Sequence, residues 1–254
     1  VVILYRWIDY RANYSWHNFP LGKTPRADRT TYEELAKVVR GKIYPEIDEF
    51  ELQQGFSIDA EWFHELALHT QVVIKKSELC YQHGRVLYST LSRYLSDSPN
   101  DQFNPPITIF ETGTARGFSS LCMAKALADH KRCGKIITFD VLPHQTKMYW
   151  NCIDDHDGVL KSRAELLKPW NELMRDYLVF HQGYTRHELP RVQVERVHFA
   201  FLDGAHTYED VWFEFEQIQY RQLSGDIIVY DDYTPEQFPG LVNAVDEICK
   251  SQGY

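Results

Sequence analysis

The sequence predicts an α/β fold: a three-layer αβα sandwich around a mostly parallel sheet, preceded by an N-terminal helical extension. From residue 107 onward, short apolar segments alternate with segments of helical periodicity. Such units form right-handed crossovers between parallel strands, and the sheet then needs helices on both faces. Before them, residues 96–106 are rich in proline and turn formers, which neither a helix nor a central strand tolerates. We therefore expect a helical extension over residues 1–95 and the α/β domain over residues 96–254.

Three helices are expected in the extension. Thr31 and Glu34 have the spacing of a capping box, with Thr31 as the N-cap. A second helix is expected from about Asp59, and a third over about residues 77–95. Residues 1–58 are otherwise irregular in pattern and rich in aromatic and charged side chains.

Strands and helices alternate in the α/β domain. The strands are expected over residues 107–110, 135–139, 177–181, 196–202 and 226–230. The helices are expected over residues 118–130, in a polar stretch around 164–173, along an apolar stripe over 208–218, and over 241–250. Aspartates follow the second, fourth and fifth strands: Asp140, Asp203, and the pair Asp231 and Asp232. Ligands of open α/β sheets bind beyond the carboxyl ends of the strands, so these aspartates are candidate site residues.

Composition narrows the class of protein. The 254 residues are 44% hydrophobic with a net charge of −9, which fits a folded domain and argues against a general nucleic-acid binder. The five cysteines are scattered without Cys-x-x-Cys spacing, as expected of reduced thiols in a cytoplasmic protein. No apolar run approaches the roughly 18 residues that span a bilayer, and the first residues do not resemble a signal peptide. We expect a cytoplasmic protein with neither nucleic acid nor membrane as a partner.

The first strand runs into a glycine loop, Glu111-Thr-Gly113-Thr114-Ala-Arg-Gly117. Gly113 would let the backbone approach a ligand, and Gly117 would allow a tight start to the next helix. The loop lacks the middle glycine of the dinucleotide motif and the Gly-Lys-Ser/Thr of a P-loop. We predict a nucleoside-type cofactor contacted by Glu111, Gly113, Thr114 and Gly117. A tight turn that binds nothing is the alternative.

Asp140 is the candidate for holding the ribose of such a cofactor. It ends the second strand, where a carboxylate can accept hydrogen bonds from both ribose hydroxyls. The alternative is that Asp140 caps a helix or a turn.

The aspartates after the fourth and fifth strands predict a metal site. Asp203, Asp231 and Asp232 repel one another at neighbouring strand ends unless a cation compensates them, and oxygen ligands suit Mg²⁺. His206 follows Asp203 by three residues and would accept a proton near neutral pH. The alternatives are that Asp203 caps the next helix, that the pair belongs to a turn, and that His206 satisfies a carbonyl at a helix start.

These motifs resemble the class I S-adenosylmethionine-dependent methyltransferases. The glycine loop is similar to their motif I. Residues 201–211, 225–233 and 239–245 resemble the catechol- and macrocin-type O-methyltransferases, and the likeness covers about residues 80–250.

The acidic segments resemble the macrolide-sugar branch of these enzymes. There, an Asp-x-x-His segment supplies a metal ligand and the base, and a later Asp-Asp pair supplies further ligands. Asp203, His206, Asp231 and Asp232 match these positions one by one. The catechol enzymes have Asp-Asn in place of the pair, so the sugar branch fits better.

The resemblance implies a Rossmann-like fold with S-adenosylmethionine as cofactor and a divalent cation, Mg²⁺, as a helper. It implies methyl transfer to a hydroxyl of a small molecule of the sugar or phenolic natural-product type, with His206 as the base. Gly183 and Tyr184 would lie beside the adenine, and Asp203 would border both the cofactor and the metal. These enzymes also end in a β-hairpin that this sequence lacks, so we expect a portion of a longer chain.

Two other functions stay open. Cephalosporin-hydroxylase-like proteins are similar to the same pattern, and motif I does not separate their reaction from methyl transfer. A catalytically silent protein of this fold would act through residues 1–58 as a binding module, although the intact acidic cluster argues against it. We expect the N-terminal helices to lie over the cleft and select the substrate, or to form a homo-oligomer contact.

Overall fold

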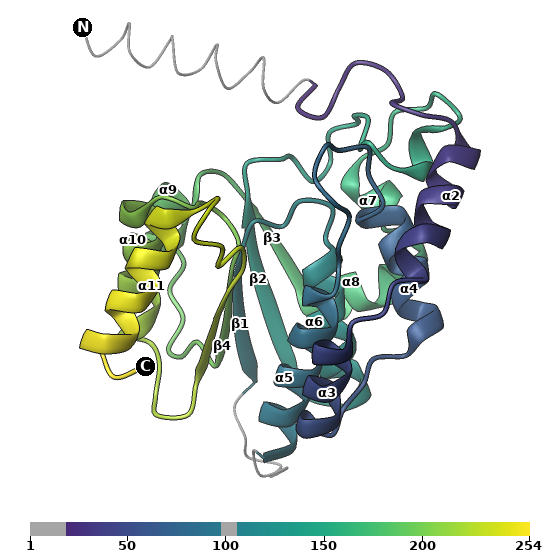
Figure 1. Cartoon of the computed structure of the whole chain (residues 1–254). Helices are drawn as coiled ribbons and strands as arrows, with labels where there is room; N and C mark the ends of the chain where they lie inside the picture. Colours follow the sequence, from purple (N-terminus) through teal and green to yellow (C-terminus); the bar gives the residue numbers. More distant parts are fainter. Residues whose placement is uncertain (1–18, 98–105) are drawn as a thin grey trace, which may run out of the picture.

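The computed structural model describes residues 19–97 and 106–254, and it confirms the predicted α/β sandwich (Figure 1). The strands are β1 (Ile107–Thr112), β2 (Gly134–Asp140), β3 (Leu178–Gln182), β4 (Phe199–Leu202) and β5 (Ile227–Tyr230). They form one sheet in the order β3-β2-β1-β4-β5, and every pairing is parallel. The strand order reverses at β1, so the crevice beyond the carboxyl ends of β1 and β4 is the expected ligand site.

Helices cover both faces of the sheet (Figure 1). One face carries α9 (Thr185–Glu188), α10 (Tyr208–Gln219) and α11 (Pro239–Ser251). The helices on the other side are α2 (Arg29–Arg40), α3 (Pro45–Gln54), α4 (Ala60–Thr70), α5 (His83–Asp97), α6 (Phe118–Asp129), α7 (Arg163–Leu166) and α8 (Asn171–Tyr177). Short 3₁₀ turns are η1 (Ile153–Asp155), η2 (Lys168–Trp170) and η3 (Leu189–Arg191). Within the described ranges, no helix is long and apolar enough to cross a membrane.

The N-terminal helices share a hydrophobic core with the sheet. Phe63 and Leu66 of α4 and Leu91 of α5 belong to the same buried cluster as Ile109 of β1 and Leu121 of α6. Burying a side chain of this size contributes roughly 1.5–3 kcal/mol, so these contacts hold the helices firmly on the sheet. The described part of the extension is therefore continuous with the α/β core, and the division at residue 95 stays a prediction.

Two predicted helix starts in the extension are wrong. Helix α2 begins at Arg29, because Asp28 is the N-cap: its Oδ1 accepts hydrogen bonds from the Thr31 amide at 2.8 Å and the Thr31 hydroxyl at 2.7 Å. The capping box at Thr31 was thus placed one turn too late. Helix α5 begins only at His83, six residues after its predicted start, whereas α4 has the predicted N-cap, Asp59. All five strands and the other expected helices are present with bounds shifted by a few residues, except that the polar stretch around residues 164–173 forms α7, η2 and α8 in succession.

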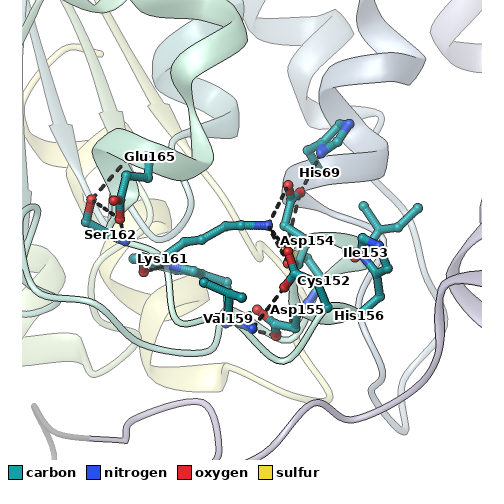
Figure 2. A network of polar contacts seen from close by, with 12 residues as sticks. His69, Cys152, Ile153, Asp154, Asp155, His156, Val159, Lys161, Ser162 and Glu165 are labelled. Atoms are coloured by element: carbon teal, nitrogen blue, oxygen red, sulfur yellow. Dashed lines mark hydrogen bonds and ion pairs between the residues drawn. The ribbon is translucent and has the colours of Figure 1, made fainter.

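A polar network fixes α4 to the segment that follows β2 (Figure 2). His69 Nδ1 lies 2.5 Å from Asp154 Oδ2, and Lys161 Nζ donates to the carbonyl oxygen of Asp154 at 2.6 Å. The buried Asp155 accepts hydrogen bonds from the amides of Trp150 and Asn151. The extension therefore stabilises the loop that continues from Asp140, at one side of the crevice.

Candidate active site

A cavity of about 560 Å³ lies at the carboxyl ends of the strands, which is a typical size for a small-molecule site. Four of the predicted cofactor residues line it: Gly113, Asp140, Gly183 and Tyr184. The other four do not line it: Glu111, Thr114, Gly117 and Asp203. Further lining residues come from the loop after β4 and from α10, among them Gly204, Ala205 and Glu214.

The two loop glycines are required by backbone conformation and by space. Gly113 and Gly117 have φ of +87° and +88°, a region that residues with a Cβ rarely adopt. A Cβ on Gly113 would lie 2.1 Å from the carbonyl oxygen of Asp203, and one on Gly117 would lie 2.7 Å from Leu167 Cδ1. Gly113 therefore lets the loop after β1 touch the loop after β4, which brings the cofactor and acidic residues together.

Glu111 lies beneath the loop rather than in the cavity. Its buried carboxylate accepts hydrogen bonds from the hydroxyls of Ser119 and Ser120, and from Thr138 at 2.5 Å. Burial raises the pKa of Glu111, and the three hydroxyls oppose that rise. Thr114 is also buried, with its hydroxyl 2.5 Å from that of Thr138. Both side chains support the loop, and their contact with a cofactor stays a prediction.

Asp140 faces the cavity and also organises the glycine loop. Its Oδ2 accepts a hydrogen bond from the Ala115 amide at 2.5 Å, and its Oδ1 accepts one from the Leu142 amide at 2.7 Å. Arg163, which we did not single out from the sequence, has Nη2 at 3.5 Å from Asp140 and donates through Nε to the Ala115 carbonyl at 2.8 Å. Burial raises the pKa of Asp140, and Arg163 lowers it. Asp140 therefore does cap a turn, as the alternative predicted, and its carboxylate also lies at the wall of the cavity.

Glu214 is a second carboxylate of the cavity that the sequence analysis missed. It is 3% exposed, and Thr112 Oγ1 donates a hydrogen bond to its Oε2 at 3.0 Å. Burial raises the pKa of Glu214 to about 8, so the side chain is mostly protonated at neutral pH. A signal was present, because Glu214 lies within the apolar stripe that includes Val211, Phe215 and Ile218. A carboxylate on the buried face of an amphipathic helix needs an explanation.

Asp203, His206 and Asp232 form an acidic cluster beside the cavity. One ligand atom from each of the three lies within 4.8 Å of the others. His206 Nε2 is buried, 3.1 Å from Asp232 Oδ2 and 3.9 Å from Asp203 Oδ1, but it makes no hydrogen bond of good geometry to any described residue. Burial and the charges of Asp231 and Asp232 raise the pKa of Asp203 to about 9. Asp231 itself lies outside this three-residue cluster, so its role as a ligand stays a prediction.

The alternative roles for the cluster are weakened by the start of α10. Thr207 is the N-cap, and its hydroxyl accepts a hydrogen bond from the Asp210 amide at 3.2 Å, so Asp203 does not cap this helix. The ring of His206 stacks on Phe238 at 4.3 Å between centroids. Asp232 does belong to a turn, with φ of +54°, a strained value that favours glycine or asparagine. Strain of this kind is frequent at functional sites.

The donor set fits a divalent cation. Among the described residues, no hydrogen bond reaches the Asp203 carboxyl group, and the neighbouring acidic groups repel one another. Among the described residues no well-aligned hydrogen bond satisfies the His206 nitrogen, which points to a missing interaction, because buried polar atoms in folded proteins are nearly always hydrogen-bonded. Two carboxylates and an imidazole nitrogen are common ligands of divalent metals.

His83, the first residue of α5, is a further candidate that the sequence analysis did not identify. Its ring is parallel to that of Phe201, with centroids 6.2 Å apart, and meets Phe118 edge-on at 5.1 Å. Burial lowers the pKa of His83, while Asp231 and Asp232 act in the opposite direction. The first residue of α5 is therefore a titratable side chain that lies toward Asp231 and Asp232, at the acidic side of the crevice.

Comparisons with known proteins agree with this architecture. Residues 110–233 match a family model described as a methyltransferase domain. The structure resembles the O-methyltransferase TomG from Streptomyces achromogenes, solved with S-adenosylmethionine, at a TM-score of 0.50 and 16% identity, over 77% of this chain and 80% of that one. It also resembles the methyltransferase PaMTH1 from Podospora anserina (TM-score 0.46, 14% identity, 92% and 90% of the two chains). A third similar structure is CalS11, a TDP-rhamnose 3'-O-methyltransferase of calicheamicin biosynthesis (0.42, 15%, 69% and 88%).

Among curated proteins, none matches the sequence. The likeness to TomG shows the fold, and the family model places a methyltransferase domain over most of the α/β region. The predicted methyltransferase domain therefore agrees with the family model over residues 110–233, and the predicted fold agrees with the likeness to TomG.

Proposed function

We propose that this methyltransferase transfers a methyl group from S-adenosylmethionine to a hydroxyl of a small molecule, with the help of a divalent cation. The observation that carries the proposal is the buried Nε2 of His206, which lies close to Asp203 and Asp232 without a well-aligned hydrogen bond to any described residue. The loop that holds these groups also supplies Gly204 and Ala205 to the wall of the cavity. A proton acceptor and a cofactor pocket therefore meet at one loop.

The cavity residues suit the cofactor. S-adenosylmethionine, when bound, supplies a methyl group activated by a positively charged sulfonium. Asp140 would accept hydrogen bonds from the ribose hydroxyls, because it lines the cavity and is oriented by the Ala115 and Leu142 amides. Gly113 leaves space for close backbone approach, and Gly183 and Tyr184 border the region assigned to the adenine. Methyl transfer is a displacement, so this fixed geometry serves alignment.

The acidic cluster would prepare the acceptor hydroxyl. Asp203 and Asp232 would hold the cation, with Asp231 as the predicted third carboxylate. A bound divalent cation lowers the pKa of a coordinated hydroxyl and favours the oxyanion. His206 would accept the proton at Nε2, while stacking on Phe238 keeps its ring in place. The substrate class proposed is a sugar or phenolic natural product.

Calorimetric titration tests the cofactor part of the proposal. S-adenosylmethionine should bind the protein saturably, and Mg²⁺ alone should raise its melting temperature by preferential binding to the folded state. Turnover should be measured by mass spectrometry on a panel of sugars and phenols, where the product gains a methyl group rather than an oxygen atom. Absence of cofactor binding with and without Mg²⁺ contradicts the proposal.

Substitution of the base tests the mechanism. His206→Gln should lower turnover by about 100-fold or more and leave the affinity for S-adenosylmethionine unchanged, because general base catalysis contributes roughly 10²–10⁴-fold. His130→Gln, at the end of α6 and away from the cavity, is the matched control. Equal turnover of the two variants would remove His206 from the mechanism.

A further inference from the structure

A second cavity, of about 640 Å³, lies at the opposite end of the sheet, beside the amino ends of β1 and β4. Arg221 lines it and is 4% exposed. Both terminal nitrogens of its guanidinium, Nη1 and Nη2, are buried and have no hydrogen-bond partner among residues 19–97 and 106–254. A guanidinium carries five N–H donors and stays charged at any physiological pH, so this is an uncompensated buried cation.

Two aromatic rings contact the Arg221 guanidinium, but they do not supply acceptors for its N–H groups. The guanidinium lies over the ring of Tyr220, with its carbon 4.7 Å from the centroid, and 5.8 Å from the centroid of Phe110. Such contacts act on the flat faces of a guanidinium. They leave the N–H groups at its edge unsatisfied, and those groups are the ones that bind carboxylate and phosphate oxygens in pairs.

Two other basic side chains of this cavity, Arg196 and His198, already have partners. Arg196 forms an ion pair with Asp226, with Nη2 and Oδ1 2.7 Å apart. His198 Nδ1 accepts a hydrogen bond from the Thr108 amide at 3.0 Å. Glu195, an exposed carboxylate, makes no ion pair with Arg221. Arg221 is therefore a buried cation of this cavity whose terminal nitrogens have no partner in the described part of the chain.

We propose that this cavity is a second ligand site, which binds an oxyanion carried on an aromatic or apolar body through Nη1 and Nη2 of Arg221. The anion supplies the two acceptors that the guanidinium lacks. The body of the ligand packs on the apolar wall, where Tyr220 and Leu223 are 65% and 62% exposed. Tyr220 covers the guanidinium, and its exposed ring moves aside as the anion enters. An aryl phosphate has the required combination of charge, shape and size.

This site is separate from methyl transfer. The candidate active site lies at the carboxyl ends of the strands and this cavity at their amino ends, so the two share no lining residue. The inference therefore stands whether or not the proposed reaction is correct.

Ligand titrations followed by NMR or calorimetry test the site, with phenyl phosphate as the probe and phenol as the uncharged control. Phenyl phosphate should bind the wild-type chain saturably, and phenol should bind about tenfold more weakly or not at all. Tyr220→Ala should keep or strengthen binding by uncovering the guanidinium. Glu195→Gln should strengthen it, because the substitution removes a negative charge from the cavity.

Arg221→Met, which keeps the length and apolar contacts of the side chain, should weaken binding of phenyl phosphate by about tenfold or more. Arg221→Lys covers the case in which Arg221→Met does not fold: it keeps the charge and loses the paired donors, so binding should still weaken. Affinity for S-adenosylmethionine should be unchanged in both. Absence of saturable binding by the wild-type and Tyr220→Ala chains, or equal affinity in the Arg221 variants, overturns the proposal.

Discussion

Two sets of carboxylates meet at the carboxyl edge of the sheet, and their surroundings are opposite. Glu111 accepts hydrogen bonds from three hydroxyls, and Asp140 accepts them from two backbone amides with Arg163 nearby. Asp203 and Asp232 lie on the other side of the Gly113 contact, where His206 Nε2 is 3.9 Å from Asp203 and 3.1 Å from Asp232. The first set has protein donors, and the second set has acidic neighbours.

This difference separates a structural role from a chemical one. A buried carboxylate with its own donors fixes a loop, because its hydrogen bonds offset part of the cost of burial. A group of carboxylates that lacks donors destabilises the fold, and it is retained where an external cation or substrate supplies the missing interaction. The comparison thus assigns the glycine loop to binding geometry and the acidic cluster to reactivity.

The largest effect on turnover is expected from substitution of Asp203, one of the carboxylates that lack protein donors. Asp203→Asn should lower turnover by roughly 10³-fold and abolish stabilisation by Mg²⁺, because a cation ligand is removed. The metal-free variant should nevertheless be more stable than the wild type by about 1 kcal/mol, because the burial and repulsion that raise the pKa of Asp203 to about 9 are relieved. Activity assays and thermal melts with and without Mg²⁺ measure both. A metal-free variant that melts lower than the wild type would contradict the comparison.

The same carboxylate-to-amide substitution at Glu111, whose carboxylate has protein donors, should instead lower the stability. Glu111→Gln should lower the free energy of unfolding by about 1–3 kcal/mol, since three hydroxyl donors share two acceptor oxygens and the amide nitrogen of Gln cannot replace one of them. Urea denaturation measures this change. The variant should keep its response to Mg²⁺, and a loss of that response would show that the two sets are one functional unit.

The sequence predicted the strands and the residue types of the site better than their contacts. The aspartates after the strands and the glycine loop were identifiable because period-two and helical patterns locate strand ends. Thr31 was misassigned because Asp28, an equally good N-cap, precedes it by three residues. Arg163 and His83 were not foreseen, because their partners are far away in the chain and no spacing rule connects them. Glu214 could have been found, as a carboxylate on the apolar stripe of α10.

A smaller effect, on cofactor affinity alone, is expected from Arg163. Arg163→Met should weaken binding of S-adenosylmethionine by about tenfold, because Arg163 orients both Asp140 and the Ala115 carbonyl. Titration calorimetry measures this affinity. Arg175→Met, on the exposed side of α8, is the matched control and should bind like the wild type. Unchanged affinity in Arg163→Met would mean that the two backbone amides alone position Asp140.

The smallest effect is a change in the pH dependence of stability, and it is expected from Glu214, another carboxyl group at the wall of the cavity. Its pKa rises from an ordinary value of 4.5 to about 8 through burial, so the folded protein holds a proton that the unfolded chain releases between these pH values. The resulting stability is complete below about pH 4.5 and is lost as pH rises through about 8. Glu214→Gln should remove this dependence, so its unfolding free energy should gain on the wild type by up to about 1 kcal/mol per pH unit in that window.

Denaturation curves at pH 5, 7 and 8.5 measure the difference, with Glu216→Gln on the exposed face of α10 as control. Parallel pH profiles for the wild type and Glu214→Gln would mean that Glu214 titrates normally in the folded protein. The Thr112 hydroxyl would then be enough to hold Glu214 as an ionised carboxylate. A gain of Glu214→Gln over the wild type as pH rises instead groups Glu214 with Asp203, as a carboxyl group whose environment keeps it neutral at neutral pH.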